Sequence, residues 1–183
     1  MKSAGEAGLR LETKRMILTP YTPEVMRLAL KNLSAGADSI GAHMGYTDAA
    51  LADFTRKIYG AKLILMERTP SAWLLCTAWQ MVLKNGRHVA GECGFKGPPD
   101  NGEIEIGYGT RKEFRNLGLM TEAVSALCGF AFSQKEFPVC KIVATTLGDN
   151  YASHRTLRKC GFNQNGRRIG LLLWEKTNSK ASG

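Results

Sequence analysis

Six consecutive residues offer the clearest chemistry in the chain: Arg115, Asn116, Leu117, Gly118, Leu119 and Met120. They follow a strand-like run that ends in glycines and precede an apolar run with helical spacing, so they form a loop at a helix N-terminus. The first N–H groups of a helix have no partner within it and carry the positive end of the helix dipole. The loop is therefore suited to bind a phosphate or a pyrophosphate.

Two residues of this loop have features that favour binding of an anion. Gly118 permits unusual backbone dihedrals and lets an anion approach without meeting a Cβ atom. Arg115 supplies a planar guanidinium group at the entrance of the loop, and such a group pairs with phosphate oxygens. One glycine and one arginine nevertheless occur together in many strand-to-helix turns, so the motif needs a second signal.

A second pattern is the run D-N-Y-A-S-H-R-T-L-R-K-C-G-F at residues 149–162, which follows a strand-like run at residues 141–147. Asn150 is positioned to cap a short helix that Gly161 ends, and Ser153 lies in the first turn of that helix. Both patterns thus place polar residues where a strand passes into a helix.

Together, the two patterns resemble the acetyl-CoA-dependent N-acetyltransferases of the GNAT superfamily, in the branch typified by RimJ and RimL. The pyrophosphate loop of this family is written R/Q-x-x-G-x-G/A; Arg115 and Gly118 match it, and Met120 replaces the last small residue. The second signature of the branch, N-x-x-S followed by an apolar helix and G-F, is met by four residues: Asn150, Ser153, Gly161 and Phe162. The similarity covers residues 9–174, and its specific motifs lie in the second half.

The resemblance implies a binding site for acetyl-CoA and no metal. In the family's geometry, backbone groups along the pantetheine arm would come from Tyr108, Gly109 and Thr110. Backbone groups around the pyrophosphate would come from Asn116, Leu117, Gly118, Leu119, Met120 and Thr121, and Arg115 would contribute its guanidinium group. The asparagine that matches Asn150 contacts the cofactor in relatives, and helix capping is the alternative role of this residue.

Two side chains are candidates for proton transfer in acetylation of an amine. Glu103 and Glu105 lie two apart on a strand and therefore share a face. Either could take the proton of the amine directly or through water, although a solvated strand face explains both equally well. We choose Glu105, because the run E-I-G-Y is where the resembling branch often carries an acid. Ser153 is the second candidate, because the matching serine approaches the thiol in relatives; otherwise it is an ordinary residue of the first helical turn.

Two departures limit what the resemblance implies about mechanism. Many GNAT enzymes carry a tyrosine acid seven residues after the asparagine, where this chain has Leu157. The glutamate that RimI-type enzymes carry five residues before the asparagine is Thr145 here. The RimI mechanism is therefore not transferred to this chain.

The N-terminal part of the chain must support these groups, and its patterns predict one strand and two helices. Residues 9–20 have the pattern of a strand, and Thr22 and Pro23 begin a helix through about residue 32. Residues 34–46 are rich in Gly, Ala and Ser and predict a loop, after which Asp48 caps a second helix. Helical spacing predicts these buried residues: Val25, Leu28, Ala29 and Leu33 for the first helix, and Leu51, Phe54 and Ile58 for the second. No structure is predicted for residues 63–76.

The C-terminal part predicts most of a sheet. Residues 79–84 and 88–96 form a hairpin around Asn85 and Gly86, and residues 103–110 add a third antiparallel strand. The helix after the loop crosses to a parallel strand at residues 141–147, and residues 162–176 form a closing hairpin. We expect an α/β fold with one GNAT domain at residues 1–183: a mixed, mostly antiparallel sheet with a central parallel pair, flanked by helices. Residues 177–183 are expected to fray.

Composition indicates where the protein works. A chain of 183 residues with 44% hydrophobic content can bury one sizeable core. It has no apolar run near the roughly 20 residues that cross a bilayer, and its N-terminus has no apolar signal core. We therefore expect a cytoplasmic protein without membrane contact. The five cysteines include no C-x-x-C pair, which favours buried thiols over a disulfide framework or a zinc site.

The net charge of +9, from 25 Lys and Arg against 16 Asp and Glu, is consistent with an anionic partner. The basic residues are dispersed and have no aromatic stacking platform, so the phosphates of CoA explain the charge better than nucleic acid does. The leading hypothesis is an acetyl-CoA-dependent N-acetyltransferase acting on a protein N-terminus or a small-molecule amine. The alternatives are a noncatalytic acyl-CoA-binding sensor and a basic module that binds a ribosome or nucleic acid. The sequence leaves open the acceptor and whether the protein is a homodimer.

Overall fold

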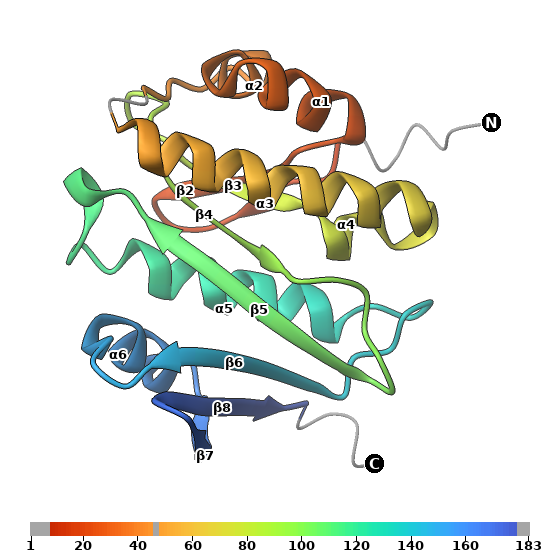
Figure 1. The fold of residues 1–183 in the computed structure, drawn as a ribbon, viewed down its shortest axis with the longest axis vertical. Coiled ribbons are helices and arrows are strands. Elements are labelled where there is room, and N and C mark those ends of the chain that lie inside the picture. Colours follow the sequence, from red (N-terminus) through yellow and green to blue (C-terminus); the bar gives the residue numbers. More distant parts are fainter. Residues whose placement is uncertain (1–7, 46–47, 179–183) are drawn as a thin grey trace.

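The computed structural model describes residues 8–45 and 48–178. These residues form an eight-stranded sheet in the order β1-β2-β3-β4-β5-β6-β8-β7, with helices on both faces (Figure 1). Neighbouring strands in this part of the chain are antiparallel except β5 and β6, which are parallel. The predicted mixed α/β sheet with a central parallel pair is confirmed.

The N-terminal strand predicted over residues 9–20 is wrong in one respect, because it is two short strands. β1 (Leu11–Glu12) and β2 (Met16–Pro20) pair antiparallel. Thr13 holds the turn between them: its N–H donates to the Met16 carbonyl at 2.9 Å, and its hydroxyl accepts from the Met16 N–H at 3.1 Å. The spacing of apolar residues does not distinguish one strand from two short strands that expose the same faces.

Helix α1 (Pro23–Lys31) begins as predicted, with the Thr22 hydroxyl accepting a hydrogen bond from the Val25 N–H at 3.3 Å. Its buried face differs in part from the prediction, because Met26 and Ala29 are buried whereas Leu28 is exposed. Apolar spacing identifies a stripe on a helix, but the rotation of the helix on its neighbours decides which side is covered.

Helix α2 (Leu33–Ser39) occupies part of the segment predicted as a loop. The Asn32 side chain caps it by accepting hydrogen bonds from the N–H groups of Ser34 and Ala35. Gly36 lets the helix pack closely on α1, since a Cβ atom at this position would lie 2.5 Å from Ala29 Cβ. The loop prediction failed because glycine here serves close packing and does not end the helix. Residues 46 and 47, also in or beside the predicted loop, lie outside the described residues.

Helix α3 (Ala49–Arg68) begins after Asp48 as predicted and continues for 20 residues. The buried face predicted for it is wrong at two of three positions, because Leu51 is 47% exposed and Phe54 is 61% exposed, whereas Ile58 is partly buried and packs against the core. The residues buried instead are Ala52, Thr55, Tyr59 and Met66. Two of these are polar side chains with hydrogen bonds, which a search for apolar spacing passes over.

The strands at the centre of the sheet follow a short helical segment. In residues 63–76, for which no structure was predicted, α3 ends at Arg68 and is followed by the 3-10 helix Pro70–Ala72 and α4 (Trp73–Cys76). β3 (Ala78–Leu83), β4 (Val89–Phe95) and β5 (Glu103–Thr110) then form the predicted antiparallel meander.

The C-terminal elements also match the expected order. After the 3-10 helix Lys112–Phe114 come α5 (Leu119–Phe132), β6 (Lys141–Leu147), α6 (Tyr151–Lys159), β7 (Asn163–Arg168) and β8 (Leu171–Thr177). Thr177 pairs with Lys141, and the Asn178 N–H donates to the Cys140 carbonyl at 2.8 Å. Residues 179–183 of the tail expected to fray lie outside the described residues.

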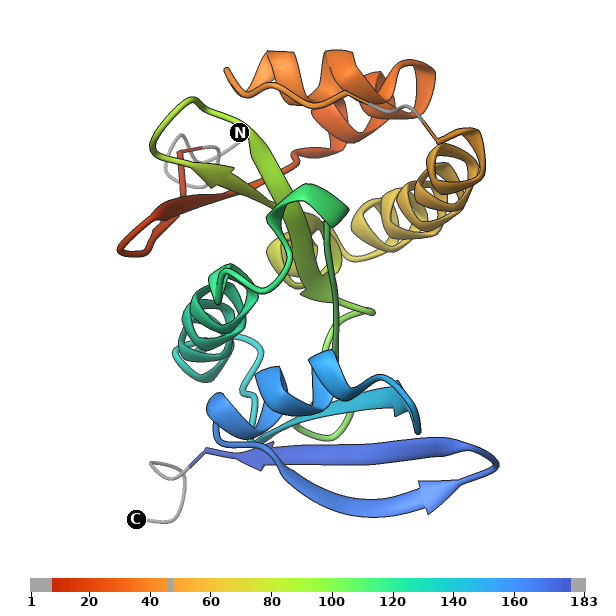
Figure 2. The same cartoon turned by 90° about the vertical axis from the view of Figure 1, so that its left-hand side faces the viewer.

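Two layers of helices determine what the side chains on each face of the sheet pack against. Helices α5 and α6 cover one face, where they pack with Trp79, Ile106 and Trp174, and α1 and α3 cover the other, where they pack with Ala78 (Figures 1 and 2). Alternation along β5 therefore directs Tyr108 toward the α5 face, like Ile106. No helix in the described segments is long and apolar enough to cross a membrane.

Candidate active site

Strands β5 and β6 form an opening in the sheet. They pair over Glu103 to Glu105 and Lys141 to Val143, and beyond these three pairs the described residues form no ladder between the two strands. Figure 1 shows the strands meeting at one end and diverging toward the other. The central sheet is therefore continuous on one side of the molecule and open beside the second half of β5.

The edge of β5 that faces the opening carries backbone polar groups. The Lys96 N–H donates to the Glu105 carbonyl at 2.8 Å, and the Arg111 N–H donates to the Ala90 carbonyl at 2.9 Å. The odd-numbered residues of β5 therefore direct their N–H and carbonyl groups to β4. Because these directions alternate along a strand, the N–H and carbonyl groups of Tyr108 and Thr110 point to the opening. An extended molecule lying there would meet a strand edge.

The predicted anion-binding loop joins β5 to α5 at this opening. Gly118 stands at the N-terminal end of α5 with φ 73° and ψ 6°, and no side chain caps the helix there. Asn116 also has a positive φ of 62°. Left-handed residues alternating with others direct successive N–H groups to one side, which makes an anion-binding concavity. Gly118 thus has the unusual backbone dihedrals for which the sequence analysis singled it out.

The N-terminal hairpin holds this loop in place. The Arg15 guanidinium donates to the Leu117 carbonyl at 2.8 Å and to Glu122 Oε1 at 2.6 Å. Thr13 donates to Glu122 Oε2 at 3.1 Å, as does the Arg15 N–H at 3.3 Å. Burial alone would raise the pKa of Glu122, but the hydrogen bonds from Arg15 and Thr13 outweigh it and lower the pKa below its usual value. The loop is thus tied to a segment far away in the sequence.

Helix α6 forms the other side of the opening. The Asn150 side chain caps α6 by accepting a hydrogen bond from the Ser153 N–H at 3.1 Å. The Tyr108 hydroxyl donates to the Ser153 carbonyl at 3.4 Å, which connects β5 to the first turn of α6. Burial raises the pKa of Tyr108 to about 12, and the hydrogen bond to Ser153 offsets only part of that rise. Tyr108 therefore keeps its proton in neutral and mildly alkaline solution.

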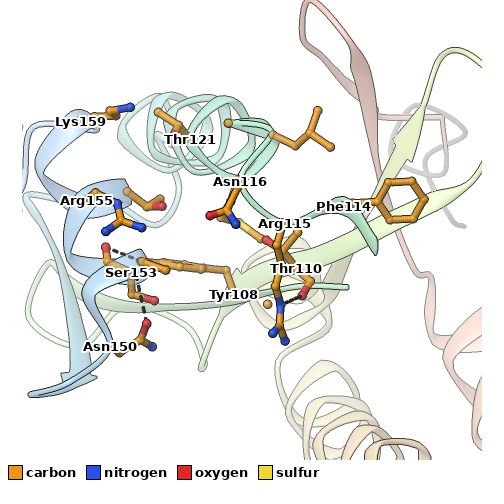
Figure 3. A pocket seen from close by; sticks show the side chains of 16 residues that line it. Tyr108, Thr110, Phe114, Arg115, Asn116, Thr121, Asn150, Ser153, Arg155 and Lys159 are labelled. Atoms are coloured by element: carbon orange, nitrogen blue, oxygen red, sulfur yellow. Dashed lines mark hydrogen bonds between the residues drawn. The ribbon is translucent and has the colours of Figure 1, made fainter. Parts of the chain in front are cut away.

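These elements enclose a cavity of about 490 Å³ (Figure 3). Most of the predicted site residues line it: Tyr108, Gly109, Thr110, Arg115, Asn116, Gly118, Leu119, Met120, Thr121, Asn150 and Ser153. Leu117 is not among the lining residues and is 54% exposed, although its carbonyl anchors the loop to Arg15.

Glu105 does not line this cavity. It lies at the last pair between β5 and β6, and its Oε1 atom is 2.6 Å from Lys96 Nζ. Its side chain shares a second hollow with Glu103, on the face of β5 opposite Ile104 and Ile106, which are buried as predicted. The structure therefore places the two predicted proton-transfer residues on different sides of the open strand.

Five lining residues were not predicted as site residues: Phe114, Ala152, Arg155, Thr156 and Lys159. Arg155 and Lys159 are four apart on α6, and residues with this spacing share a face of a helix. Figure 3 shows Arg155 entering the cavity from α6 and Asn116 from the loop. The sequence shows the basic residues between Arg155 and Lys159. Because Asn150 begins the same helix, placing them on that helix would have identified both cations.

Comparison with known proteins agrees with this geometry. The family model described as acetyltransferase (GNAT) domain matches residues 15–163. The uncharacterized N-acetyltransferase YjdG of Bacillus subtilis (strain 168) is 38% identical over 98 residues, which are 53% of this chain and 57% of that protein. The alignment therefore spans little more than half of this curated relative.

Solved structures of the same fold include two ribosomal-protein acetyltransferases. Ribosomal-protein-S5-alanine acetyltransferase from Vibrio fischeri has a TM-score of 0.65 and 16% identity, covering 93% of this chain and 97% of that one. RimL, a ribosomal L7/L12 alpha-N-protein acetyltransferase in complex with coenzyme A, has a TM-score of 0.62 and 16% identity, covering 92% and 98%. At these identities the likeness shows a shared fold.

Proposed function

The chain belongs to the acetyltransferase (GNAT) family, and on that premise we propose that it transfers the acetyl group of acetyl-CoA to a primary amine of a protein N-terminus or a small molecule. The observation that carries the proposal is the cavity in which an uncapped helix N-terminus, a left-handed glycine and an open strand edge meet. The RimL structure of the same fold contains coenzyme A.

The residues of the cavity fit the parts of CoA. The loop around Gly118 offers N–H groups and a helix dipole to the pyrophosphate, and Arg155 and Lys159 add positive charge for phosphate oxygens. The outward groups of Tyr108 and the N–H of Thr110 suit the amides of the pantetheine arm, whereas the Thr110 carbonyl accepts a hydrogen bond from Arg115 Nε at 3.3 Å. Gly109 directs its backbone groups to β4, so its contribution is the absence of a side chain. Asn150 contributes by fixing the first turn of α6.

The reaction requires a neutral amine. Its nitrogen attacks the thioester carbonyl carbon, the new C–N bond forms, and the C–S bond breaks. The nitrogen loses one proton and the departing thiolate gains one, so the products are an amide and a thiol. The protein supplies position, hydrogen-bond donors and proton carriers.

We assign the proton transfers to the two candidates from the sequence. Ser153 lines the cavity and would donate its hydroxyl proton to the thiolate, regaining a proton from solvent. Glu105 stands where the strands separate, on the other face of β5, and would accept the proton of the amine through water.

Thiol release from acetyl-CoA in the presence of an amine tests the function. The panel contains peptides with free N-termini, lysine amide, butylamine and putrescine, and acetyl-CoA binding is measured by calorimetry in parallel. We expect tight binding, and turnover that rises with pH as the amine loses its proton, with a pKa of about 10.4 for a lysine-like amine and about 7.7 to 8.0 for an α-amine. Tight binding without turnover for any amine would favour a noncatalytic sensor.

A further inference from the structure

A carboxylate outside the proposed mechanism lies on the α3 face of β4. The Tyr59 hydroxyl donates to Glu92 Oε2 at 2.7 Å, and Gln80 Nε2 donates to the same oxygen at 3.2 Å. Tyr59 and Gln80 are both buried, with 0% and 1% exposure. Two buried donors on one oxygen hold the carboxylate in a single orientation.

The second oxygen of Glu92 is differently placed. Among the described residues, Glu92 Oε1 has no hydrogen-bond partner, and it is not one of the fully buried polar atoms that lack one. Glu92 is only partly buried. An anionic oxygen that is held away from protein donors is stabilised by water or by a cation.

Glycines leave open space beside this carboxylate. Glu92 lies opposite Gly109 in the β4–β5 ladder, and Gly94 lies opposite Gly107, so all four residues share the α3 face. A Cβ atom added to Gly109 would meet nothing within 4 Å, and one added to Gly107 would meet only Lys96 Cε at 4.0 Å. The open space reaches β5 from the face opposite Tyr108. Because Gly109 also lines the cofactor cavity, this space adjoins it.

The neighbouring cations make their direct contacts elsewhere. Lys62 donates to the carbonyls of Cys76, Thr77 and Phe95 at 3.3, 3.1 and 2.7 Å. Burial lowers the pKa of Lys62, and the charge of Glu92 offsets part of that change, so the two groups interact through space without a contact. Lys96 contacts Glu105. Within the described residues, Glu92 therefore has no contact ion pair, whereas Glu105 on the same face has one.

We propose that Glu92 is the acceptor-binding carboxylate, with Tyr59 and Gln80 as its positioning residues. This inference rests on the proposed function and adds the class of acceptor: an amine that arrives as a cation, on the face of β5 opposite the cofactor. Primary amines are largely protonated at neutral pH, so a carboxylate with one unengaged oxygen selects them over neutral nucleophiles. Glu92 binds and orients the cation, which passes one proton through water to Glu105 before the neutral amine attacks at the opening between β5 and β6. The nitrogen releases its second proton to solvent as the amide forms, and Ser153 protonates the thiolate.

The substitution Glu92→Gln tests this role with little change of shape, because the amide oxygen still accepts hydrogen bonds from Tyr59 and Gln80. We expect the KM for butylamine and putrescine to rise on the order of 10-fold to 100-fold, as for loss of a charged hydrogen bond. The Kd for acetyl-CoA should not change. Tyr59→Phe should raise the same KM by a smaller factor, because the carboxylate is then less firmly oriented.

The matched control is Glu67→Gln, which removes another carboxylate, at the C-terminal end of α3, that pairs with Arg27. It should leave KM unchanged, and equal unfolding temperatures show that the variants fold. Butylguanidinium, a cation that is not a primary amine substrate, provides a second measurement: its calorimetric binding to the CoA complex should be lost in Glu92→Gln. Absence of turnover in the wild type would overturn the proposed function alone. Equal KM values, or equal butylguanidinium binding, in wild type and Glu92→Gln would overturn the role of Glu92.

Discussion

The two faces of β5 differ in the chemistry that they present. On the α5 face, the cavity carries Arg115, Arg155 and Lys159 together with the N–H groups of a helix terminus. On the α3 face, the strand is bordered by Glu92 and Glu105 over a floor of glycines. A single open strand thus separates a surface suited to an anionic cosubstrate from one suited to a cationic acceptor.

The two faces also differ in whether the backbone or the side chains provide the groups proposed to bind. On the face proposed for the cofactor, binding would depend on backbone geometry, which a substitution changes only at a special dihedral or a helix cap. On the face proposed for the acceptor, binding would depend on carboxylates, whose removal changes the charge. Apart from the two proton-transfer candidates, variants on the first face should alter the Kd for acetyl-CoA, and variants on the second face should alter the KM for the amine. A binding-group variant that altered the other quantity would contradict this comparison.

The largest effect is expected from the proton-transfer candidates, one on each face. Ser153→Ala and Glu105→Gln should each lower kcat by roughly 10²-fold to 10⁴-fold. The Kd for acetyl-CoA should stay nearly constant, because both groups act on charge that develops only in the transition state. Steady-state kinetics across pH, with calorimetry, measures both. Full kcat in both variants would mean that positioning alone drives the reaction.

A smaller effect, confined to the cofactor face, is expected from Gly118→Val. A β-branched residue in the left-handed region costs about 1–2 kcal/mol, and its side chain also obstructs the anion. Acetyl-CoA affinity should fall by more than about 10-fold, and by much more than in Arg115→Ala. Gly170→Val is the control, because Gly170 has a φ of 75° in the distant β7–β8 turn. If both valine variants bind acetyl-CoA equally well, the loop is not the pyrophosphate site.

The cations of α6 should contribute less. Removing both in Arg155→Gln/Lys159→Gln should weaken acetyl-CoA binding by several-fold to about 10-fold, because exposed pairs contribute ~0.2–1 kcal/mol each. The difference from wild type should shrink as salt screens the charges. Arg167→Gln/Arg168→Gln removes the same charge from β7 and serves as control. An equal loss in both double variants would indicate an effect of net charge rather than of the cavity.

The smallest effect is expected where the N-terminal hairpin holds the loop. Arg15→Ala should cost ~0.2–1 kcal/mol of stability, as a partly exposed ion pair does, and should weaken acetyl-CoA binding slightly. Because the pKa of Glu122 in the folded protein is lowered, its stabilisation is complete above the unfolded pKa of about 4.3 and is lost as pH falls through the folded value. Denaturant titrations at pH 7 and near pH 4 measure this. Equal wild-type and Glu122→Gln responses to acid would contradict it.

The predicted parts of the cofactor face were encoded locally. A left-handed glycine before an apolar helix, and an asparagine three residues before a serine in the first turn, each involve neighbours in sequence. The bounds of β5 were predicted correctly for the same reason, since a polar turn and a glycine-containing end enclose a short alternating run. These signals depend on backbone dihedrals and helix caps, which a few adjacent residues determine.

The parts that could not be predicted depend on which distant surfaces meet. The exposed side chains of Leu51 and Phe54, which apolar spacing assigned to the core, show that the rotation of α3 follows from its contacts with the sheet. The burial of Tyr59 could be recognised only together with Glu92, 33 residues later in the chain.

By itself, the amino-acid sequence determined the family, the loop and the helix cap, because glycine dihedrals, caps and alternation operate over a few residues. The tertiary structure alone decided that Arg15 holds the loop across 102 residues of sequence and that Glu92 and Glu105 share a face opposite the cofactor cavity. Strand register brings such groups together. Register results from the packing of whole elements, so a short segment of sequence does not determine it.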